Sequence, residues 1–307
     1  MSQNFKYQLV GLATAVSAIV AKVDNDIVVD GAVPGNVRAG RGGMVCNTLA
    51  VAAALGARVG GVIATGSDVT GRALREVVTA EGVDAAFVTT TRTPITVTLA
   101  AGGTRSSIMG VDGEREQHLD PTDVTTAWQK LGASTVWVLL TLPALDSPAG
   151  VSFLELARAT GASIAVTLSS AGHVSERAAR LGALLTGVDL VFGNADEIAA
   201  MGHAGVEPGL VLATYGADGA VVIRRGARTI KVDIPGPLEV VDVTGAGDSF
   251  AAGVLSLLNP EHCSDEKISA AILLGHQAAG VVISRLGAQP GVDGAQILRE
   301  IGRANGL

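Results

Sequence analysis

The order of apolar segments along this chain is the feature that most limits its fold. Short, nearly continuous apolar runs alternate with segments of helical spacing. Such runs are typical of parallel strands covered by helices on both faces, so we predict an α/β fold with three layers, α/β/α. The predicted strands are residues 8–14, 58–65, 85–91, 135–141, 163–169, 188–193 and 209–214, and helices are expected to begin near Met44, Thr70, Thr122, Pro148, Val174, Ala195, Gly247, Asp265 and Val292. A site is expected beyond the carboxyl ends of the strands.

Two segments, 26–40 and 93–110, break this rhythm because polar and apolar residues alternate in them. The second contains a Gly-Gly pair at 102–103, which is a turn signal. We predict that both segments form exposed antiparallel strands of a small sheet, acting as a lid or as a dimer surface. No linker or repeat interrupts the sequence, so residues 1–307 are expected to form a single domain that carries this lid.

The apolar run LVGLATAVSAIV at 9–20 follows Lys6 and has small residues near its end. The hydrophobic part of a signal peptide has a similar pattern. A single lysine makes a weak positive region, however, and the run is too short to span a bilayer. We therefore expect a buried first strand that leads into the core.

Charge and cysteine content restrict the partners and the compartment. The net charge is −7 and aromatic residues make up 3%, whereas binding to nucleic acid requires a basic surface and often stacking platforms. A small anion remains compatible, because backbone N–H groups bind phosphate on acidic proteins too. Cys46 and Cys263 have neither metal-ligand spacing nor the number needed for a disulfide framework. We expect a cytoplasmic protein with no nucleic-acid or membrane partner.

The stretch DVTGAGDSF, residues 242–250, runs into a predicted helix. The first N–H groups of a helix lack intrahelical partners and carry positive charge, and glycine lets a ligand approach the backbone. Gly245, Ala246 and Gly247 are thus predicted to form an anion cradle with Asp248 in the first turn. This pattern suits phosphoryl transfer to a hydroxyl whose proton Asp248 accepts. The alternative is an aspartate that caps the helix after a glycine-rich turn.

Five motifs in this order resemble those of ribokinase-like sugar and nucleoside kinases, the phosphofructokinase-B type. DVTGAGDSFAAG resembles the family signature, and residues 42–74 resemble its N-terminal signature with a Gly-Gly pair and a downstream asparagine. NADE at 194–197, TYGADGA at 214–220 and HQAAGVVISRLGAQPGV at 276–292 resemble further family motifs. The resemblance covers nearly the whole chain and implies a ribokinase-like fold with a mainly parallel central sheet and a small β-sheet lid.

The resemblance implies a catalytic role for Asp248 as the base and for residues 245–247 as the anion hole. Asn194 and Glu197 match residues that organise Mg²⁺ and the phosphates, with Glu197 acting on the metal through water. A turn cap before a helix is the alternative explanation for Asn194.

Thr214, Gly216 and Gly219 match the nucleotide-binding strand and turn of the family, and His276 matches a position beside the adenine. Taken alone, this stretch would be an ordinary hairpin. His276 would equally well be a packed core residue.

The resemblance also places Asp242 near a site for a monovalent cation, potassium, with a polar loop cap as the alternative. Gly42 and Gly43 match residues at which the substrate approaches the backbone, and Asn47 matches a contact to sugar hydroxyls. A helix-entry turn is the alternative role for the two glycines.

The sequence departs from the family on the acceptor side. Where many sugar-binding members have an aspartate in the first strand, this chain has Val16 followed by Ser17. Where ribokinases have a glutamate, it has Leu142 and Pro143. Three aspartates nearby in sequence are candidates to replace the missing acids: Asp24, Asp26 and Asp30.

Three arginines in or beside the predicted lid strands are candidates to bind an acidic sugar through bidentate pairing: Arg38, Arg41 and Arg105. Solvated surface charge is the alternative. Residues 167–181 faintly resemble the adenosine-kinase branch of the family.

These observations predict an ATP-dependent kinase that uses Mg²⁺, and K⁺ if the Asp242 site is present. It would phosphorylate a primary hydroxyl of a small sugar and dimerise through the lid. The alternatives are a nucleoside kinase of the adenosine, cytidine or pseudouridine type, and a ligand-binding protein of this fold without turnover. A dinucleotide-dependent oxidoreductase is disfavoured, because no Gly-x-Gly-x-x-Gly turn follows the first strand.

Overall fold

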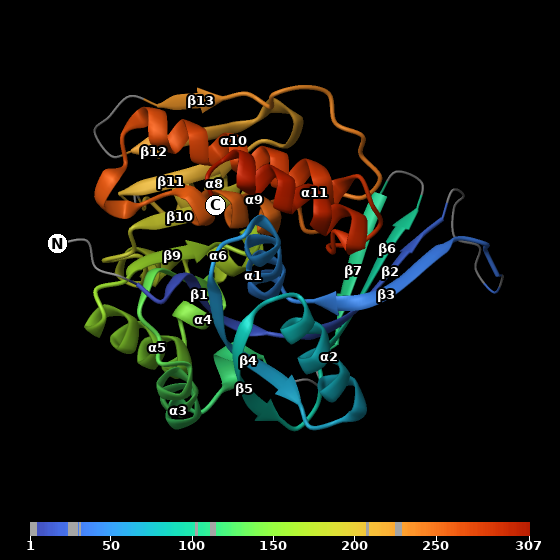
Figure 1. Cartoon of the computed structure of the whole chain (residues 1–307), viewed down its shortest axis with the longest axis horizontal. Helices are drawn as coiled ribbons and strands as arrows, with labels where there is room; N and C mark the ends of the chain where they lie inside the picture. The colour runs from blue at the N-terminus through green and yellow to red at the C-terminus, as the bar shows by residue number, and fades with distance from the viewer. Residues whose placement is uncertain are drawn as a thin grey trace.

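The computed structural model describes residues 5–23, 30, 32–101, 104–110, 115–206, 209–224 and 229–307. In this part of the chain, nine strands form a large sheet in the order β13-β12-β11-β10-β9-β8-β1-β4-β5 (Figure 1). Its strands are β1 (Tyr7–Thr14), β4 (Val59–Gly66), β5 (Asp84–Thr90), β8 (Thr135–Thr141), β9 (Ser163–Thr167), β10 (Leu190–Asn194), β11 (Leu210–Thr214), β12 (Ala220–Arg224) and β13 (Ile230–Val232). The strands from β11 to β5 are parallel, which confirms all the predicted core strands, and β12 and β13 add an antiparallel edge.

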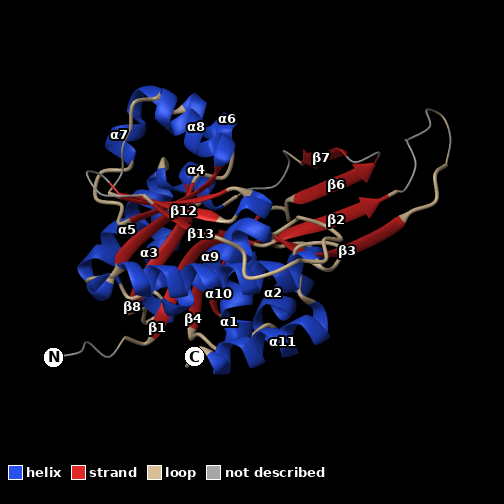
Figure 2. Ribbon diagram, turned by 90° about the horizontal axis from the view of Figure 1, so that it is seen from above, coloured by secondary structure: helices blue, strands red, loops and turns tan. Residues whose placement is uncertain are grey.

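Helices cover both faces of this sheet, as predicted (Figure 2). One face packs against α1 (Met44–Leu55), α2 (Val69–Ala80), α9 (Ala246–Leu257), α10 (Asp265–Ile283) and α11 (Gly291–Ala304). The other face packs against α3 (Pro121–Leu131), α4 (Leu142–Leu145), α5 (Pro148–Ala159), α6 (Ala171–Glu176), α7 (Leu181–Leu184) and α8 (Ala195–His203). Short 3₁₀ turns are η1 (Glu116–His118), η2 (Ala178–Arg180), η3 (Gly216–Asp218) and η4 (Pro260–His262). Within the described residues, no helix is long and apolar enough to cross a bilayer.

The predicted helix starts agree with the structure to within one residue, except for α6. That helix was expected near Val174 and begins at Ala171. The side chain of Ser170 accepts a hydrogen bond from the backbone N–H of His173 and caps the helix one turn earlier.

A second sheet in the described residues has the strand order β3-β2-β6-β7 and projects from the large sheet (Figure 1). Its strands are β2 (Val16–Lys22), β3 (Asn36–Gly42), β6 (Ile95–Ala101) and β7 (Thr104–Met109). The predicted small sheet is therefore present, and segment 93–110 supplies its antiparallel pair β6–β7. Residues 26–29 and 31 of the first predicted segment, and the Gly-Gly pair at 102–103, lie outside the described residues.

The apolar run at 9–20 contains the buried first strand that we expected, but the run continues beyond the end of that strand. It divides at Ala15: β1 ends at Thr14 in the large sheet, and β2 leaves it for the centre of the small sheet. The small-sheet part is apolar because Val16, Ala18 and Val20, which share one face of β2, line a cavity beneath it. The first half of this run is therefore apolar because it lies in the core sheet, and the second half because one face of β2 lines the cavity.

Two glycines hold α9 against α10. A Cβ on Gly253 would lie 2.6 Å from the Cα of Gly275, so the two helix backbones approach more closely than side chains would allow. This contact sets the position of α9, whose first turn lies at the centre of the site described below.

Candidate active site

Helix α9 begins in a loop that presents its N-terminus without a side-chain cap. Its N-cap residue, Gly245, has a φ of 80° and, as a glycine, supplies no side-chain cap bond to the helix start. A Cβ on Gly245 would lie 2.7 Å from the Cβ of Ala288, so glycine is required both by the backbone conformation and by packing. The predicted cradle, Gly245, Ala246 and Gly247, thus forms the positive end of the helix dipole.

Three cavities meet at this helix start, and Gly247 lines all of them. The sheet cavity, about 390 Å³, lies between the small sheet and α9. The middle cavity, about 160 Å³, is lined by Asn194, Glu197, Thr214 and Asp248 among others. The outer cavity, about 630 Å³, lies toward β12, β13 and α10. Asp248 lines the sheet cavity and the middle cavity, so its carboxylate lies where they join.

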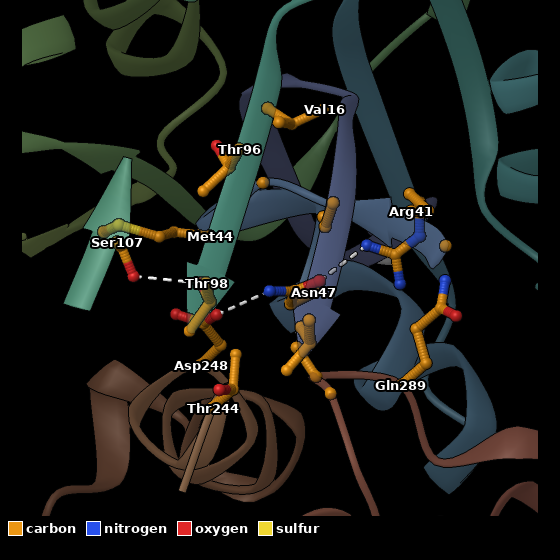
Figure 3. A pocket seen from close by; sticks show the side chains of 18 of the residues that line it. Val16, Arg41, Met44, Asn47, Thr96, Thr98, Ser107, Thr244, Asp248 and Gln289 are labelled. Carbon is orange, nitrogen blue, oxygen red and sulfur yellow. Dashed lines mark hydrogen bonds between the residues drawn. The ribbon is translucent and has the colours of Figure 1, made fainter. Parts of the chain in front are cut away.

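The inner face of the small sheet forms the wall of the sheet cavity. The pairing places Val20 opposite Arg38 on β3 and Thr98 on β6, and Thr98 in turn opposite Ser107 on β7. The hydroxyls of Thr98 and Ser107 are 2.9 Å apart and both line the cavity (Figure 3). This wall is therefore apolar along β2 and hydroxyl-bearing along β6 and β7.

Asp248 is held by a chain of hydrogen bonds that runs from Glu81, the residue after α2, through Arg41 and Asn47. Figure 3 shows its last two links, from Arg41 to Asn47 and from Asn47 to Asp248. The Nδ2 of Asn47 donates to Asp248 Oδ2 at 2.7 Å, and Arg41 donates to Asn47 Oδ1 at 2.8 Å. Arg41 also pairs with both carboxylate oxygens of Glu81, at 2.6 and 3.3 Å. Because the Arg41 side chain is only 1% exposed, this arginine fixes the Asn47 amide and does not extend toward a ligand, contrary to its suggested role in binding an acidic sugar.

Asn194 and Glu197 form a reciprocal capping box at the start of α8. Asn194 Oδ1 accepts from the backbone N–H of Glu197, and Glu197 Oε2 accepts from the backbone N–H of Asn194, both at 3.0 Å. The cap considered as an alternative for Asn194 is thus present, and both side chains still line the middle cavity. Burial raises the pKa of the Glu197 carboxyl, against the effect of its bond to the Asn194 N–H.

Thr214, Gly216, Gly219 and His276 come together around the outer cavity, as the motif predicts. Gly219 has a φ of 86°, and a Cβ there would collide with the carbonyl oxygen of Val232. His276 is buried beside the Phe250 ring at 5.3 Å between centroids. Burial lowers the pKa of His276, so its ring is neutral at pH 7.

Asp242 joins two loops beside the site. Its carboxylate accepts hydrogen bonds from the Thr244 N–H and hydroxyl, at 2.9 and 2.7 Å, and from the Gly287 N–H at 2.8 Å. The polar cap that we considered for Asp242 is therefore formed, and potassium binding there stays a prediction.

Gly42 and Gly43 lie at the sheet cavity, where β3 passes into α1. Gly43 has a φ of 102°, and a Cβ there would collide with the carbonyl oxygen of Thr14. The turn into the helix is thus a structural reason for this glycine, while its exposure to the cavity leaves the substrate role open.

Sequence reasoning missed several residues that line the sheet cavity: Met44, Thr96, Thr98, Ser107, Met109, Arg115 and Gln289. The alternation in 93–110 predicted exposed strands of a lid, but it did not identify which side chains of β6 and β7 line the site. Among the substitutes considered for the missing acids, Asp24 and Asp26 lie outside the described residues. Asp30 is not among the cavity's lining residues, and the side chain of Arg105 lies outside the described part of the chain.

An uncapped helix start, an adjacent carboxylate and cavities on either side form an arrangement that suits the transfer of an anionic group between two ligands. Residues 9–294 match the pfkB family of carbohydrate kinases, and the chain belongs to this family.

Its relatives agree with this class. A ribokinase from Haemophilus influenzae is 28% identical over 277 residues, which is 84% of this chain and 85% of the relative. An aminoimidazole riboside kinase from Salmonella typhimurium is 27% identical over 270 residues, 78% of this chain and 81% of the relative. The structure of an adenosine kinase from Sinorhizobium meliloti is 26% identical and matches with a TM-score of 0.78 over 96% of this chain and 99% of that chain. The protein is a phosphotransferase with an alcohol acceptor, a sugar or nucleoside kinase of the ribokinase type.

Proposed function

We propose that this protein transfers the γ-phosphoryl group of Mg·ATP to a primary hydroxyl of a small sugar. The observation that carries the proposal is the position of Asp248, at the junction of the sheet cavity and the middle cavity, in the first turn of a helix with no side-chain cap. The acceptor would occupy the sheet cavity, the phosphates the middle cavity, and the nucleoside the outer cavity.

In this arrangement Asp248 accepts the proton of the acceptor hydroxyl while the 245–247 backbone stabilises charge on the transferring group. A weak base is sufficient, because the transition state of phosphoryl transfer is largely dissociative. Asn47 orients the carboxylate through the 2.7 Å bond to Oδ2. Asn47 is thus a positioning residue in this proposal, and its contact to the acceptor remains a prediction.

The residues of the middle cavity fit a hydrated Mg²⁺. Glu197 supplies a buried carboxylate of which one oxygen, Oε2, bonds to the Asn194 N–H. Mg²⁺ keeps several waters and needs few protein oxygens, so Glu197 would hold it through water. The ion would supply charge neutralisation at the phosphates, and its charge would offset the burial that disfavours ionised Glu197.

The small sheet would act as a lid. Its inner face covers the cavity that contains Asp248, and closing it would exclude water that otherwise hydrolyses ATP.

The outer face of the small sheet supports dimerisation with a second copy of this chain. Most residues that alternate with the cavity-lining ones are apolar, and Val37, Ile95 and Ile108 are 69%, 49% and 72% exposed. We expect Ile108→Lys to dissociate the dimer in sedimentation velocity runs at micromolar concentration. The matched control is Val292→Lys, which changes an 85% exposed residue of α11. A wild-type monomer at that concentration would refute the dimer.

A nucleoside is the second candidate acceptor. The apolar side chains of Val16, Ala18 and Val20 form a surface on which a base could pack, and an adenosine kinase is among the structures similar to this chain.

The proposal is tested by measuring ADP release with Mg·ATP and potassium. The acceptor panel contains ribose, fructose, keto-deoxygluconate, adenosine, cytidine and pseudouridine. Asp248→Asn should lower kcat by about 10²–10⁴-fold on any acceptor that is turned over. The control is Asp120→Asn at the N-cap of α3, where asparagine caps equally well. Equal turnover by wild type and Asp248→Asn contradicts the role of Asp248. ATP binding without turnover of any acceptor favours a ligand-binding protein.

A further inference from the structure

The charges around the sheet cavity do not suit a neutral sugar alone. Its described lining includes three arginines, Arg38, Arg41 and Arg115, but Asp248 is its one acidic side chain. Arg41 is neutralised by Glu81, which leaves Arg38 at the rim and Arg115. Carboxylates bind sugar hydroxyls well because they accept hydrogen bonds from them. The position expected to supply such a carboxylate has Val16.

Arg115 is held firmly at the carboxyl edge of the large sheet. The next residue, Glu116, is buried and bonds through its side chain to the hydroxyls of Thr14 and Thr141, at the ends of β1 and β8. The Glu116 backbone N–H also donates to Thr14 Oγ1 at 2.7 Å. The parallel sheet therefore places the base of the Arg115 side chain where ligands bind in such folds.

Part of the Arg115 guanidinium is buried without a partner. Its second terminal nitrogen, Nη2, has no hydrogen-bond partner among the described residues, and the same is true of His173 Nδ1. Arg115 also contributes, after burial and Arg177, to lowering the pKa of His173, which places the two side chains in one region. A buried charged donor without a partner is unfavourable. The Arg115 side chain also lines the sheet cavity, so an anionic ligand group there would pair with the charge of its guanidinium.

We propose that the acceptor carries an anionic group, a carboxylate or a phosphate, which Arg115 binds while the acceptor's hydroxyl faces Asp248. This inference rests on the kinase function proposed above and specifies its substrate class. Arg38 of β3 lines the same cavity and adds positive charge at the entrance of this cavity.

The experiment compares matched acceptors. Fructose is run beside its 1-phosphate and 6-phosphate, and 2-deoxyglucose beside keto-deoxygluconate, so that the phosphate and carboxylate sources are separated. Wild type should prefer one anionic member over its neutral counterpart by roughly 10- to 100-fold in kcat/KM. Arg115→Gln should lose that preference mainly through KM, because the anion is bound alike in the ground and transition states.

Three further variants complete the test. Arg115→Lys should retain part of the preference, and Arg299→Gln, an exposed arginine of α11, should retain all of it. In Asp248→Asn, which binds without turning over, the preferred anionic acceptor should raise Tm, and adding Arg115→Gln should abolish that rise. Thermal unfolding without ligand shows whether each variant is folded.

The outcomes separate the two proposals. If turnover depends on Asp248 but a neutral acceptor has a kcat/KM at least as high as that of every anionic acceptor, the proposal of an anionic acceptor is wrong and the kinase function stands. An anionic preference that survives Arg115→Gln, or a panel in which no anionic member binds, also overturns it. Turnover that survives Asp248→Asn contradicts the proposed mechanism instead.

Discussion

Replacing Arg41 by methionine should weaken both the fold and catalysis, because one side chain serves both. Arg41 is 1% exposed and makes three hydrogen bonds, two to Glu81 and one to Asn47. Removing one partner of a buried ion pair costs about 3–5 kcal/mol. Since the Glu81 side chain is 24% exposed and would regain some hydration, we expect about 3 kcal/mol at the lower end of that range.

The catalytic effect follows from Asn47. Without the Arg41 donor, the Asn47 amide oxygen loses the contact that orients its Nδ2 toward Asp248. A misplaced carboxylate should lower kcat by about tenfold, equivalent to about 1.4 kcal/mol of activation free energy. Arg41 acts on Asp248 through Asn47, so the effect should appear in kcat more than in the KM for ATP.

The assay is a double-mutant cycle in urea, with Arg41→Met, Glu81→Gln and the pair. Methionine retains most of the apolar stem, so the cycle isolates the polar contacts. The pair should be less destabilised than the sum of the single variants by about 1–3 kcal/mol. The reasoning would be refuted by single variants that each cost under 1 kcal/mol and add without coupling, or by unchanged kcat in Arg41→Met.

Other predictions concern backbone, protonation and thiols. Gly43→Ala should cost roughly 3 kcal/mol, because alanine would be strained at a φ of 102° and would collide with Thr14; urea unfolding at wild-type stability would contradict this. Burial lowers the pKa of His276 below its usual 6.5, so the unfolded chain binds the proton more tightly than the folded one, and the free energy of unfolding falls as pH drops from about 6.5 toward the folded pKa. His276→Gln should flatten this dependence of unfolding free energy on pH. An unchanged slope in the variant would count against the prediction. Burial raises the pKa of Cys46 to about 12, so a thiol reagent at pH 8 should titrate only Cys263 in the folded protein and both cysteines in urea.

The large sheet could be predicted from the sequence because its signals are local. Each core strand is a continuous apolar run, and most helices begin at a residue whose neighbours cap or start a helix, such as Asp120–Pro121 before α3. The uncapped start of α9 was predictable for the same reason, since glycine at 245 and 247 and aspartate at 248 act within one turn. Resemblance to the family then supplied roles that local chemistry alone left open.

The acceptor side could not be predicted, because it depends on contacts between distant segments. Arg41 looked like a free cation in the sequence, and only the fold brings it to Glu81, the residue after α2, forty residues away. Arg115 lies in a segment with no regular pattern, and its position depends on Glu116 reaching the ends of β1 and β8. No periodicity in a single sequence records such contacts.

Strand register in the small sheet therefore decides what the acceptor meets. With the observed pairing, Val16, Ala18 and Val20 line the cavity, and Ser17, Ile19 and Ala21 face away. A slip of one residue in β2 would exchange these two sets and disrupt both the cavity wall and the apolar outer face. The turn at Ala15 prevents this, because the Ala15 N–H donates to the Ala64 carbonyl at 3.0 Å and the Ser17 N–H to the Pro94 carbonyl at 2.9 Å. The core sheet thus sets the register of β2, and a change of acceptor specificity is more readily reached by substituting cavity-facing side chains than by rebuilding the sheet.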